Sequence, residues 1–280
     1  MKQRKLFCEI SPLCYQISTA KNRALRRMRD AFFGANFART RNTTPLPHRI
    51  YRHASIIRRE LANVDATLQN NKAVNLMLSA PRVNGILIRP GETFSFWRLV
   101  GLPSARRGYL TGLTIAHGVP AQDIGGGLCQ FTNLLHWLIL HTPLTITEHH
   151  HHDGVDLFPD SGRNVPFGTG TSILYNYLDY RFKNDTDAAF QLLVHADGDL
   201  LYDEIRSDQP VPFRYDIVSQ DEHFVREADG VYRCGSVVRI CTDAKTGEVC
   251  ARTCIKQNHA RVLYDTDGLV LREAADGKLH

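Results

Sequence analysis

Three consecutive glycines that lead into a cysteine, at residues 125–129, constrain the fold of this chain more than any other stretch. Glycine runs occur where the backbone turns sharply or is approached closely by another group. The apolar residues that follow recur at the spacing of one helix face. Cys129 is therefore predicted in the first turn of a helix, where free backbone N–H groups and the helix dipole favour a negative charge. Such a position lowers the pKa of a thiol and yields the nucleophilic thiolate.

Two helices are expected before this turn. Residues 1–44 are basic and are compatible with a helix that starts at Ser18 or Thr19 and ends near Gly34. A second helix is expected over residues 54–79, because apolar residues there recur every three or four positions. The asparagines at 70, 71 and 75 predict a break in that helix, since asparagine is unfavourable inside helices.

Strand patterns dominate the remainder. A strand pair is expected from Gly108 to Val119, and a short strand before Glu148 carries the chain into four consecutive histidines. Residues 186–206 alternate in hydrophobicity around an Asp-Gly turn, which predicts a hairpin. A second hairpin is expected around residues 245–247, with Cys241 facing Cys250 across it. Cys234, Cys241, Cys250 and Cys254 lack the paired spacing of a zinc site.

We expect an α+β fold with a helical N-terminal region, a mainly antiparallel sheet packed on the Cys129 helix and a small β-rich C-terminal part. The expected division is a basic helical segment at 1–53, a core domain at 54–209 and a β-rich region at 210–280. A chain of 280 residues is long enough to bury a large core.

The net charge of +5 is mild, and most of the basic excess lies near the N-terminus. This segment is interpreted as a solvated basic face, or as a contact for an acidic partner or a membrane surface. No nucleic-acid motif accompanies it. We expect no transmembrane segment and no secretory signal, and hence a cytoplasmic protein whose seven cysteines are reduced.

A thiol nucleophile needs a base, a group that orients the base, and donors for an oxyanion. The histidine run and the aspartates of residues 153–160 supply the first two, and the helix N-terminus or Gln130 the third. The candidate catalytic residues are Cys129, His152, His150 and Asp156, and the candidate residues for binding substrate or oxyanion are Gly126, Gly127, Gln130 and Glu148.

Three other interpretations stay open. Cys129 would be a small packing residue if the glycines served only the turn. A metal site could use His150, His152 and Asp156, although no metal and no cofactor is expected. A non-catalytic protein could bind an anionic group at the helix N-terminus. The sequence leaves the oligomeric state open.

Three blocks of sequence resemble the VanW family: Pro90–Phe96, then Gly108-Tyr109, then residues 125–130. The resemblance runs from about Ala54 to Asn184. His149 stands where the family has arginine, and the pair at 152–153 replaces its His-Ser. The resemblance implies a link to the bacterial cell wall, and some exported relatives are associated with L,D-transpeptidation through the cysteine of the third block.

Cys129 would then be the nucleophile and His152 the leading base. The expected function is that of a cysteine-dependent acyl transferase or hydrolase. Its expected substrate is a small molecule or a peptide that contains an amide bond, such as a peptidoglycan-related amide. The alternatives are a non-catalytic accessory protein linked to cell-wall or glycopeptide-resistance functions, or a histidine-rich metal-binding protein. Whether the chain is an enzyme stays open at this point.

Overall fold

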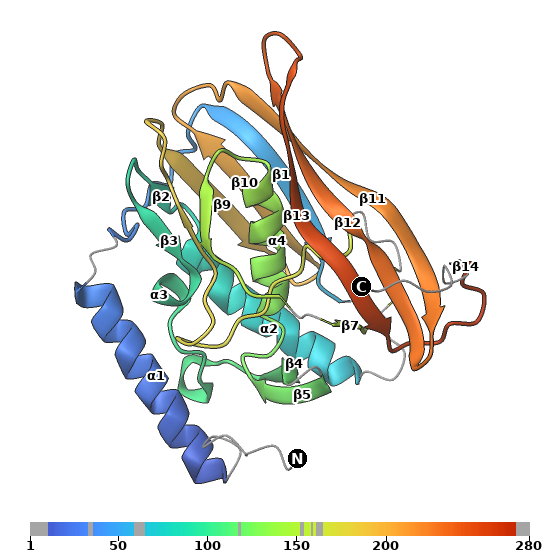
Figure 1. Cartoon of the computed structure of the whole chain (residues 1–280). Coiled ribbons are helices and arrows are strands. Elements are labelled where there is room, and N and C mark those ends of the chain that lie inside the picture. The colour runs from blue at the N-terminus through green and yellow to red at the C-terminus, as the bar shows by residue number, and fades with distance from the viewer. Residues whose placement is uncertain are drawn as a thin grey trace.

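The structure is a computed structural model that describes residues 11–32, 36–58, 65–116, 119–151, 154–157, 159–160 and 165–272. Its helices and mostly antiparallel strands confirm the α+β class (Figure 1). The strands of the described residues form four sheets.

The first sheet has four antiparallel strands in the order β1 (His48–Ile56), β10 (Leu200–Ser207), β9 (Phe190–Ala196) and β2 (Leu87–Ile88). The hairpin of β9 and β10 confirms the one expected over residues 186–206. Every second residue of β10 is buried, and so are Phe190, Leu192 and Val194 of β9, because alternate side chains of a strand point to opposite faces. These side chains form one wall of the core.

The helix expected over residues 54–79 is wrong at its start. Residues 54–56 belong to β1, where they pair with β10, and helix α2 runs over Ala66–Val83; residues 59–64 lie outside the described part. The predicted break near the asparagines is also wrong. Asn75 is fully buried within α2, where its amide binds the backbone of Leu110 and Gly126. A buried polar residue in a helix is tolerated when its hydrogen bonds are made elsewhere.

Two smaller sheets flank this core. β3 (Thr93–Ser95), β8 (Arg181–Lys183) and β6 (Thr145–Glu148) form one of them. The hairpin of β4 (Thr111–Ala116) and β5 (Val119–Ile124) forms the other, a few residues later than the pair expected from Gly108. The short helices α3 (Phe96–Val100) and η2 (Ala105–Arg107) connect them.

The C-terminal region is β-rich, as expected, but three of its strands are long rather than short. β11 (Phe213–Glu227), β12 (Gly230–Asp243) and β13 (Val249–Val262) form an antiparallel meander, with β14 (Leu271–Arg272) and β7 (Val155–Asp156) at its edges. The hairpin of β12 and β13 confirms the predicted turn. Its register is shifted by one residue from the expectation, because Cys241 lies opposite Ala251 rather than Cys250.

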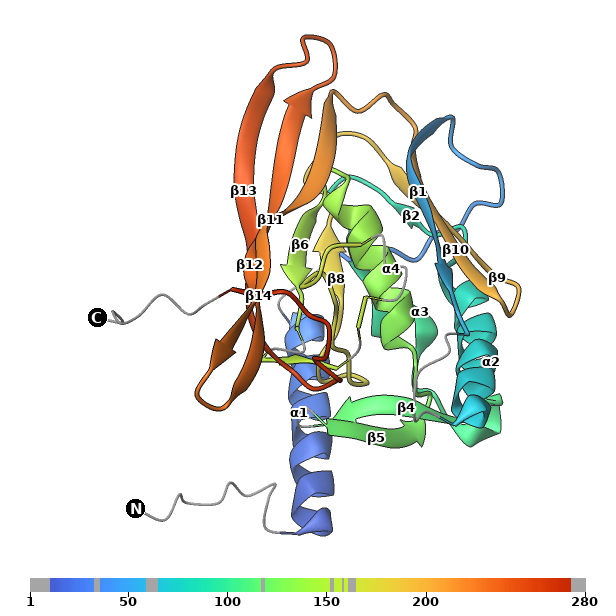
Figure 2. The same ribbon diagram turned by 90° about the vertical axis from the view of Figure 1, so that its right-hand side faces the viewer.

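Helix α4 (Cys129–Leu140) is the centre of the molecule. It lies between the first sheet and the long C-terminal strands (Figure 2). Its residues from 131 to 140 are buried except Asn133, in keeping with a helix that is apolar on nearly all sides. The predicted packing of the antiparallel strands on the Cys129 helix is therefore confirmed.

Helix α1 (Pro12–Phe32) begins six residues before the expected cap at Ser18. It lies at the edge of the molecule in both ribbon views (Figures 1 and 2). Arg26 and Asp30 connect it to the body through ion pairs with Glu148 and Arg181.

Candidate functional site

The glycine turn before α4 brings two backbone segments into close contact. Gly125 and Gly127 have φ angles of 83° and 89°, which favour glycine. A Cβ atom added to Gly126 would lie 2.1 Å from the carbonyl oxygen of Gly112 on β4, so a larger residue would clash with backbone. Gly126 also accepts a hydrogen bond of 2.9 Å from the amide of Asn75. Gly126 therefore holds β4 and α2 against the start of α4.

Cys129 is the first residue of α4, as predicted, and as a whole residue it is partly exposed. Its pKa is nevertheless raised, because burial of the sulfur outweighs the nearby Lys72 ammonium and the backbone N–H groups of Gln130 and Cys129, which lower it. The prediction that the pKa of Cys129 is lowered overall is therefore wrong. The helix terminus acts in the predicted direction, but desolvation is the larger effect.

Lys72 was missed by the sequence analysis. It lies on α2, and its aliphatic stem lies so close to Gly127 that a Cβ atom there would be 2.3 Å from its Cγ atom. Gly127 thus makes room for a lysine whose charge acts on the Cys129 thiol. A lysine on a separate helix leaves no motif beside the cysteine, so only the fold brings the two together.

The side chain of Gln130 is bound to the first sheet. Its side-chain nitrogen donates to the hydroxyl of Ser55 at 2.9 Å and to the carbonyl of Ile56 at 2.8 Å, both on β1. These bonds use both hydrogens of the amide. The described structure therefore gives Gln130 the role of attaching α4 to β1.

The chain after the histidine run crosses the first turns of α4. The Asn133 side-chain oxygen accepts bonds of 2.6 and 2.8 Å from the backbone and the hydroxyl of Thr171. The hydroxyls of Thr132 and Thr171 are 2.5 Å apart, and Thr132 also donates to the Cys129 carbonyl at 3.1 Å. Asn133 and Thr171 are further residues near Cys129 that the sequence analysis missed.

A histidine farther along α4, His136, packs against the histidine run that follows β6. His136 is buried, stacks on His149 with ring centroids 4.0 Å apart, and its Nδ1 lies 3.2 Å from the Tyr180 hydroxyl. Burial and the neighbouring His151 lower the pKa of His149 to about 4, and burial lowers that of His136 well below its ordinary value. His149 and His136 are therefore neutral at pH 7.

His150 and Glu148, two predicted site residues, bind each other. His150 Nε2 lies 3.0 Å from a Glu148 oxygen, and Glu148 also accepts two bonds from Arg26 and one from the backbone N–H of Asp179. Burial alone would raise the pKa of Glu148, but these bonds lower it to about 2. Glu148 is thus a permanent anion that holds α1 and the strand β6 together.

Asp156 lies in a different cluster. Its carboxylate accepts bonds from Arg233 at 3.2 Å and from the Tyr264 hydroxyl at 3.1 Å, beneath the C-terminal strands. Arg233 also binds Asp160 and Glu222. His152, the expected base, lies outside the described residues.

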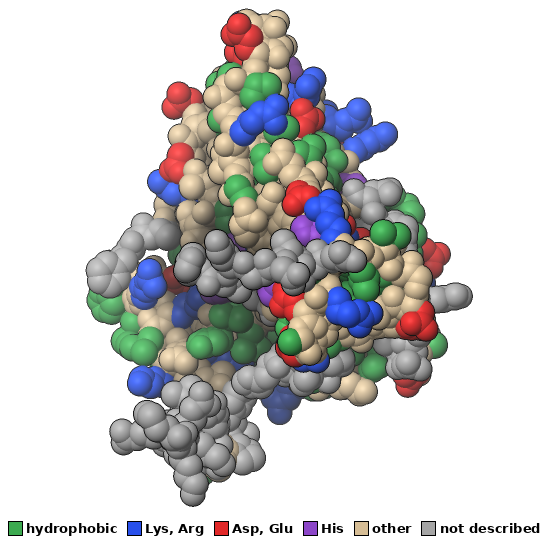
Figure 3. Space-filling view, turned by 45° about the vertical axis from the view of Figure 1, so that its right-hand side comes forward, with side chains coloured by type: hydrophobic (Ala, Val, Ile, Leu, Met, Phe, Trp, Pro, Cys, Tyr) green, Lys and Arg blue, Asp and Glu red, His purple; other side chains and the backbone are tan. Residues whose placement is uncertain are grey.

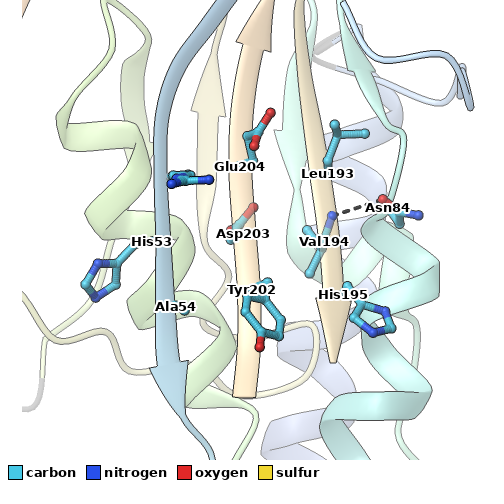
Figure 4. Close-up of a pocket in the computed structure, with 10 residues that line it drawn as sticks. His53, Ala54, Asn84, Leu193, Val194, His195, Tyr202, Asp203 and Glu204 are labelled. Atoms are coloured by element: carbon cyan, nitrogen blue, oxygen red, sulfur yellow. Dashed lines mark hydrogen bonds between the residues drawn. The ribbon is translucent and has the colours of Figure 1, made fainter. Parts of the chain in front are cut away.

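The structure also contains a cavity of about 630 Å³, which is lined by β1, β10, β9 and the residue that ends α2 (Figure 4). Asn84 lies at one side, where its side-chain oxygen accepts a 3.0 Å bond from the Val194 backbone. Cys129 is not among its lining residues. Within the described ranges, no three His, Cys, Asp or Glu side chains form a metal site.

The seven predicted site residues that the structure describes fall into three groups. Gly126, Gly127, Cys129 and Gln130 form the helix start, joined by Lys72. His150 and Glu148 form an ion-pair network with α1. Asp156 belongs to the Arg233 cluster. In the first group, the Lys72 ammonium and backbone N–H groups of the helix start act on the thiol of Cys129.

An α+β fold in which a glycine turn places a cysteine at the start of a central buried helix defines the class of this protein. The family model described as "VanW like protein" matches residues 71–206, which include the turn, α4 and the histidine run. The chain is 34% identical over 233 residues to the vancomycin B-type resistance protein VanW of Enterococcus faecalis, covering 83% of this chain and 84% of that protein. The chain belongs to the VanW family.

A second relative is more distant. The uncharacterized protein YoaR of Bacillus subtilis is 28% identical over 117 residues, which cover 41% of this chain and 36% of YoaR. No solved structure shows a significant match to the chain. Among the helices that the structure describes, none combines the length and the apolar character needed to cross a bilayer.

Proposed function

We propose that this VanW-family protein is a cysteine-dependent acyl transferase or hydrolase whose nucleophile is Cys129. The observation that carries the proposal is the setting of the sulfur. Cys129 is a residue of intermediate exposure at the start of a buried helix, and although burial raises the pKa of its thiol, the Lys72 ammonium and two backbone N–H groups act to lower it. These are the groups that support a thiolate and the oxyanion of an acyl intermediate.

The proposed reaction begins with loss of the thiol proton to a base. The sulfur attacks the carbonyl carbon of an amide, the C–N bond breaks, and the amine leaves with a proton, so that a thioester to Cys129 remains. An amine or water then attacks the thioester and releases the thiol. Because burial raises the pKa of Cys129, the resting thiol is protonated and the reaction needs such a base.

Lys72 and His152 are the proposed groups around this proton transfer. Lys72 is beside the thiol in the structure. His152 stays a proposal from the sequence, because it lies outside the described residues. His150 is less suited to the role, since its ring is bound to Glu148 at 3.0 Å.

The proposed substrate is a peptidoglycan stem peptide. The relative from Enterococcus faecalis is named for vancomycin resistance, a property of the cell wall. The amide before a terminal D-alanine of the stem tetrapeptide is the bond that L,D-transpeptidation would cleave. Its acyl part would then be held as a thioester on Cys129.

A non-catalytic accessory function is the second candidate, and the raised pKa of Cys129 favours it. A protonated thiol in a tightly packed turn would serve packing alone. In that case the start of α4 would be a structural joint between β4 and α2 and would carry out no chemistry.

The test is intact-mass measurement after incubation with a stem tetrapeptide. We expect an adduct with the mass of the acyl tripeptide and release of D-alanine. Cys129→Ser should remove the thioester, whereas Cys254→Ser, at an exposed position on β13, should leave it unchanged. Lys72→Met should slow its formation. A wild-type protein that never forms an adduct and releases no D-alanine from stem peptides would favour the accessory function.

A further inference from the structure

Helix α1 has its polar and apolar faces reversed relative to an ordinary surface helix. A surface helix normally buries its apolar stripe against the protein and exposes its polar face. In α1, Arg26 and Asp30 face the body. Arg26 binds Glu148 at 2.7 and 2.8 Å, and Asp30 accepts two bonds of 2.7 and 2.8 Å from Arg181.

The opposite face of α1 is exposed and apolar. Its large side chains fall within about one third of the helix circumference at ~100° per residue. These side chains, with their exposed fractions, are Leu13 (64%), Ile17 (49%), Leu25 (48%), Met28 (48%) and Phe32 (81%). We call these five residues the apolar face of α1. An exposed apolar stripe of this length marks an interaction surface.

Basic side chains border the apolar face. Arg27 and Arg29 lie on its two sides and Lys21 lies within it, and all three are exposed. No acidic partner of these three occurs among the ion pairs of the described residues. Residues 1–32 carry eight basic side chains and two acidic ones. Hydrophobic and basic side chains gather at the lower left of the space-filling view (Figure 3), on the side where α1 lies in Figure 1.

We propose that the apolar face of α1 docks on the surface of an anionic lipid bilayer. An interfacial helix of this kind inserts its apolar side chains at the headgroup boundary and places basic residues against anionic headgroups. A 21-residue helix is about 31 Å long, so it would lie flat in the interface. The ion pairs of Arg26 and Asp30 would keep the body attached to the docked helix.

The charge pattern favours a bilayer over a second copy of the chain. Two α1 helices packed through their apolar faces would bring Lys21, Arg27 and Arg29 of both copies close together, and like charges repel. An anionic surface instead neutralises them. Because the polar face of α1 is bound to the body through Arg26 and Asp30, only the apolar face can contact a partner. A flat bilayer surface can contact a single face, whereas a groove would have to enclose the helix.

The experiment is flotation of the full chain with vesicles of phosphatidylcholine alone or of phosphatidylcholine and phosphatidylglycerol in equal parts. We expect binding to the anionic vesicles that weakens as salt is raised. Ile17→Glu with Met28→Glu should abolish it. Arg27→Gln with Arg29→Gln should weaken it by about fivefold for each basic residue removed.

Val249→Glu is the matched control, because Val249 is an apolar residue of the C-terminal hairpin that is 50% exposed. It should leave vesicle binding unchanged. All these positions are exposed, so circular dichroism should show an intact fold. The proposal is overturned if the wild type does not float with anionic vesicles, or if Val249→Glu is as harmful as the α1 variants. It is also overturned if light scattering shows a dimer that Ile17→Glu with Met28→Glu dissociates.

Discussion

At the scale of single residues, Asp203 is an acid in an unfavourable environment. Asp203 on β10 is buried, and neither of its carboxylate oxygens has a hydrogen-bond partner among the described residues. Burial raises its pKa well above the ordinary value. Folding therefore raises the proton affinity of this carboxyl group, and stability is lost as the pH rises above the ordinary pKa of an aspartate.

Asp203→Asn is expected to stabilise the protein at pH 8. The unfolded chain loses the Asp203 proton above about pH 4, whereas the folded protein keeps it up to the raised pKa, so wild-type stability falls as pH rises through this range. The variant should gain about 1.4 kcal/mol per pH unit there relative to wild type. Denaturant titration at pH 4.5 and pH 8 measures this gain, with the exposed Asp187→Asn as control. An equal effect of Asp203→Asn at both pH values would contradict it.

At the scale of elements, an arginine of the C-terminal sheet binds the end of α4. Arg239 on β12 donates to the carbonyl of Leu140 at 2.8 Å and also binds the carbonyl of Thr142. The last carbonyls of a helix lack partners within the helix, and a cation suits the negative end of its dipole. Arg239 therefore joins the C-terminal strands to the central helix.

Arg239→Met should destabilise the protein by about 1.5–3 kcal/mol, because charged hydrogen bonds to buried carbonyls are lost while the apolar stem is kept. Chemical denaturation followed by circular dichroism measures the loss. Arg252→Met, on the exposed part of β13, should change stability by less than about 0.5 kcal/mol. Similar effects of the two substitutions would show that Arg239 does not hold α4.

The elements that the sequence predicts well are those with a strong local pattern. The apolar run after Cys129 predicted α4, and the alternating residues around the Asp-Gly turn predicted the hairpin of β9 and β10. The start of the expected second helix failed, because residues 54–56 have helical spacing but pair with β10. Such a pairing joins distant positions, as Ala54 and Tyr202 show, which are 148 residues apart, so no local pattern reveals it.

The candidate site shows the same limit. The glycine turn and Cys129 were identified from a local motif. Lys72 was missed because it lies on α2, and its proximity to the thiol depends on packing. The direction of the thiol pKa was wrong because burial depends on the whole fold, whereas the helix terminus can be seen in the sequence.

At the scale of the whole molecule, several histidines are kept neutral by the fold. Burial lowers the pKa values of His53, His136, His141 and His149, the last to about 4. Between pH 6.5 and pH 4 the unfolded chain binds protons at these positions that the folded protein does not. Stability should therefore be fully present above pH 6.5 and fall as pH decreases toward 4.

This pH dependence is measurable as the melting temperature from pH 7.5 to pH 4.5, which should decrease steadily below pH 6.5. Asp203 acts in the opposite direction, and Glu148, whose pKa is about 2, contributes only below pH 4.5. His149→Gln, which can still donate to the Gly170 carbonyl, should make the decrease shallower. A constant melting temperature across this range would contradict the neutral state of the histidines.

The central claim is that Cys129 is a reachable thiol whose charge state depends on Lys72. It is tested most directly by alkylation of the native protein with iodoacetamide, with the rate at Cys129 followed against pH by mass spectrometry. We expect Cys129 to react in the folded protein, with a midpoint above the value of about 8.5 for an ordinary thiol, because burial raises the pKa of Cys129. In Lys72→Met the midpoint should rise further. A Cys129 that reacts only after unfolding, or a midpoint that Lys72→Met does not move, would contradict the account.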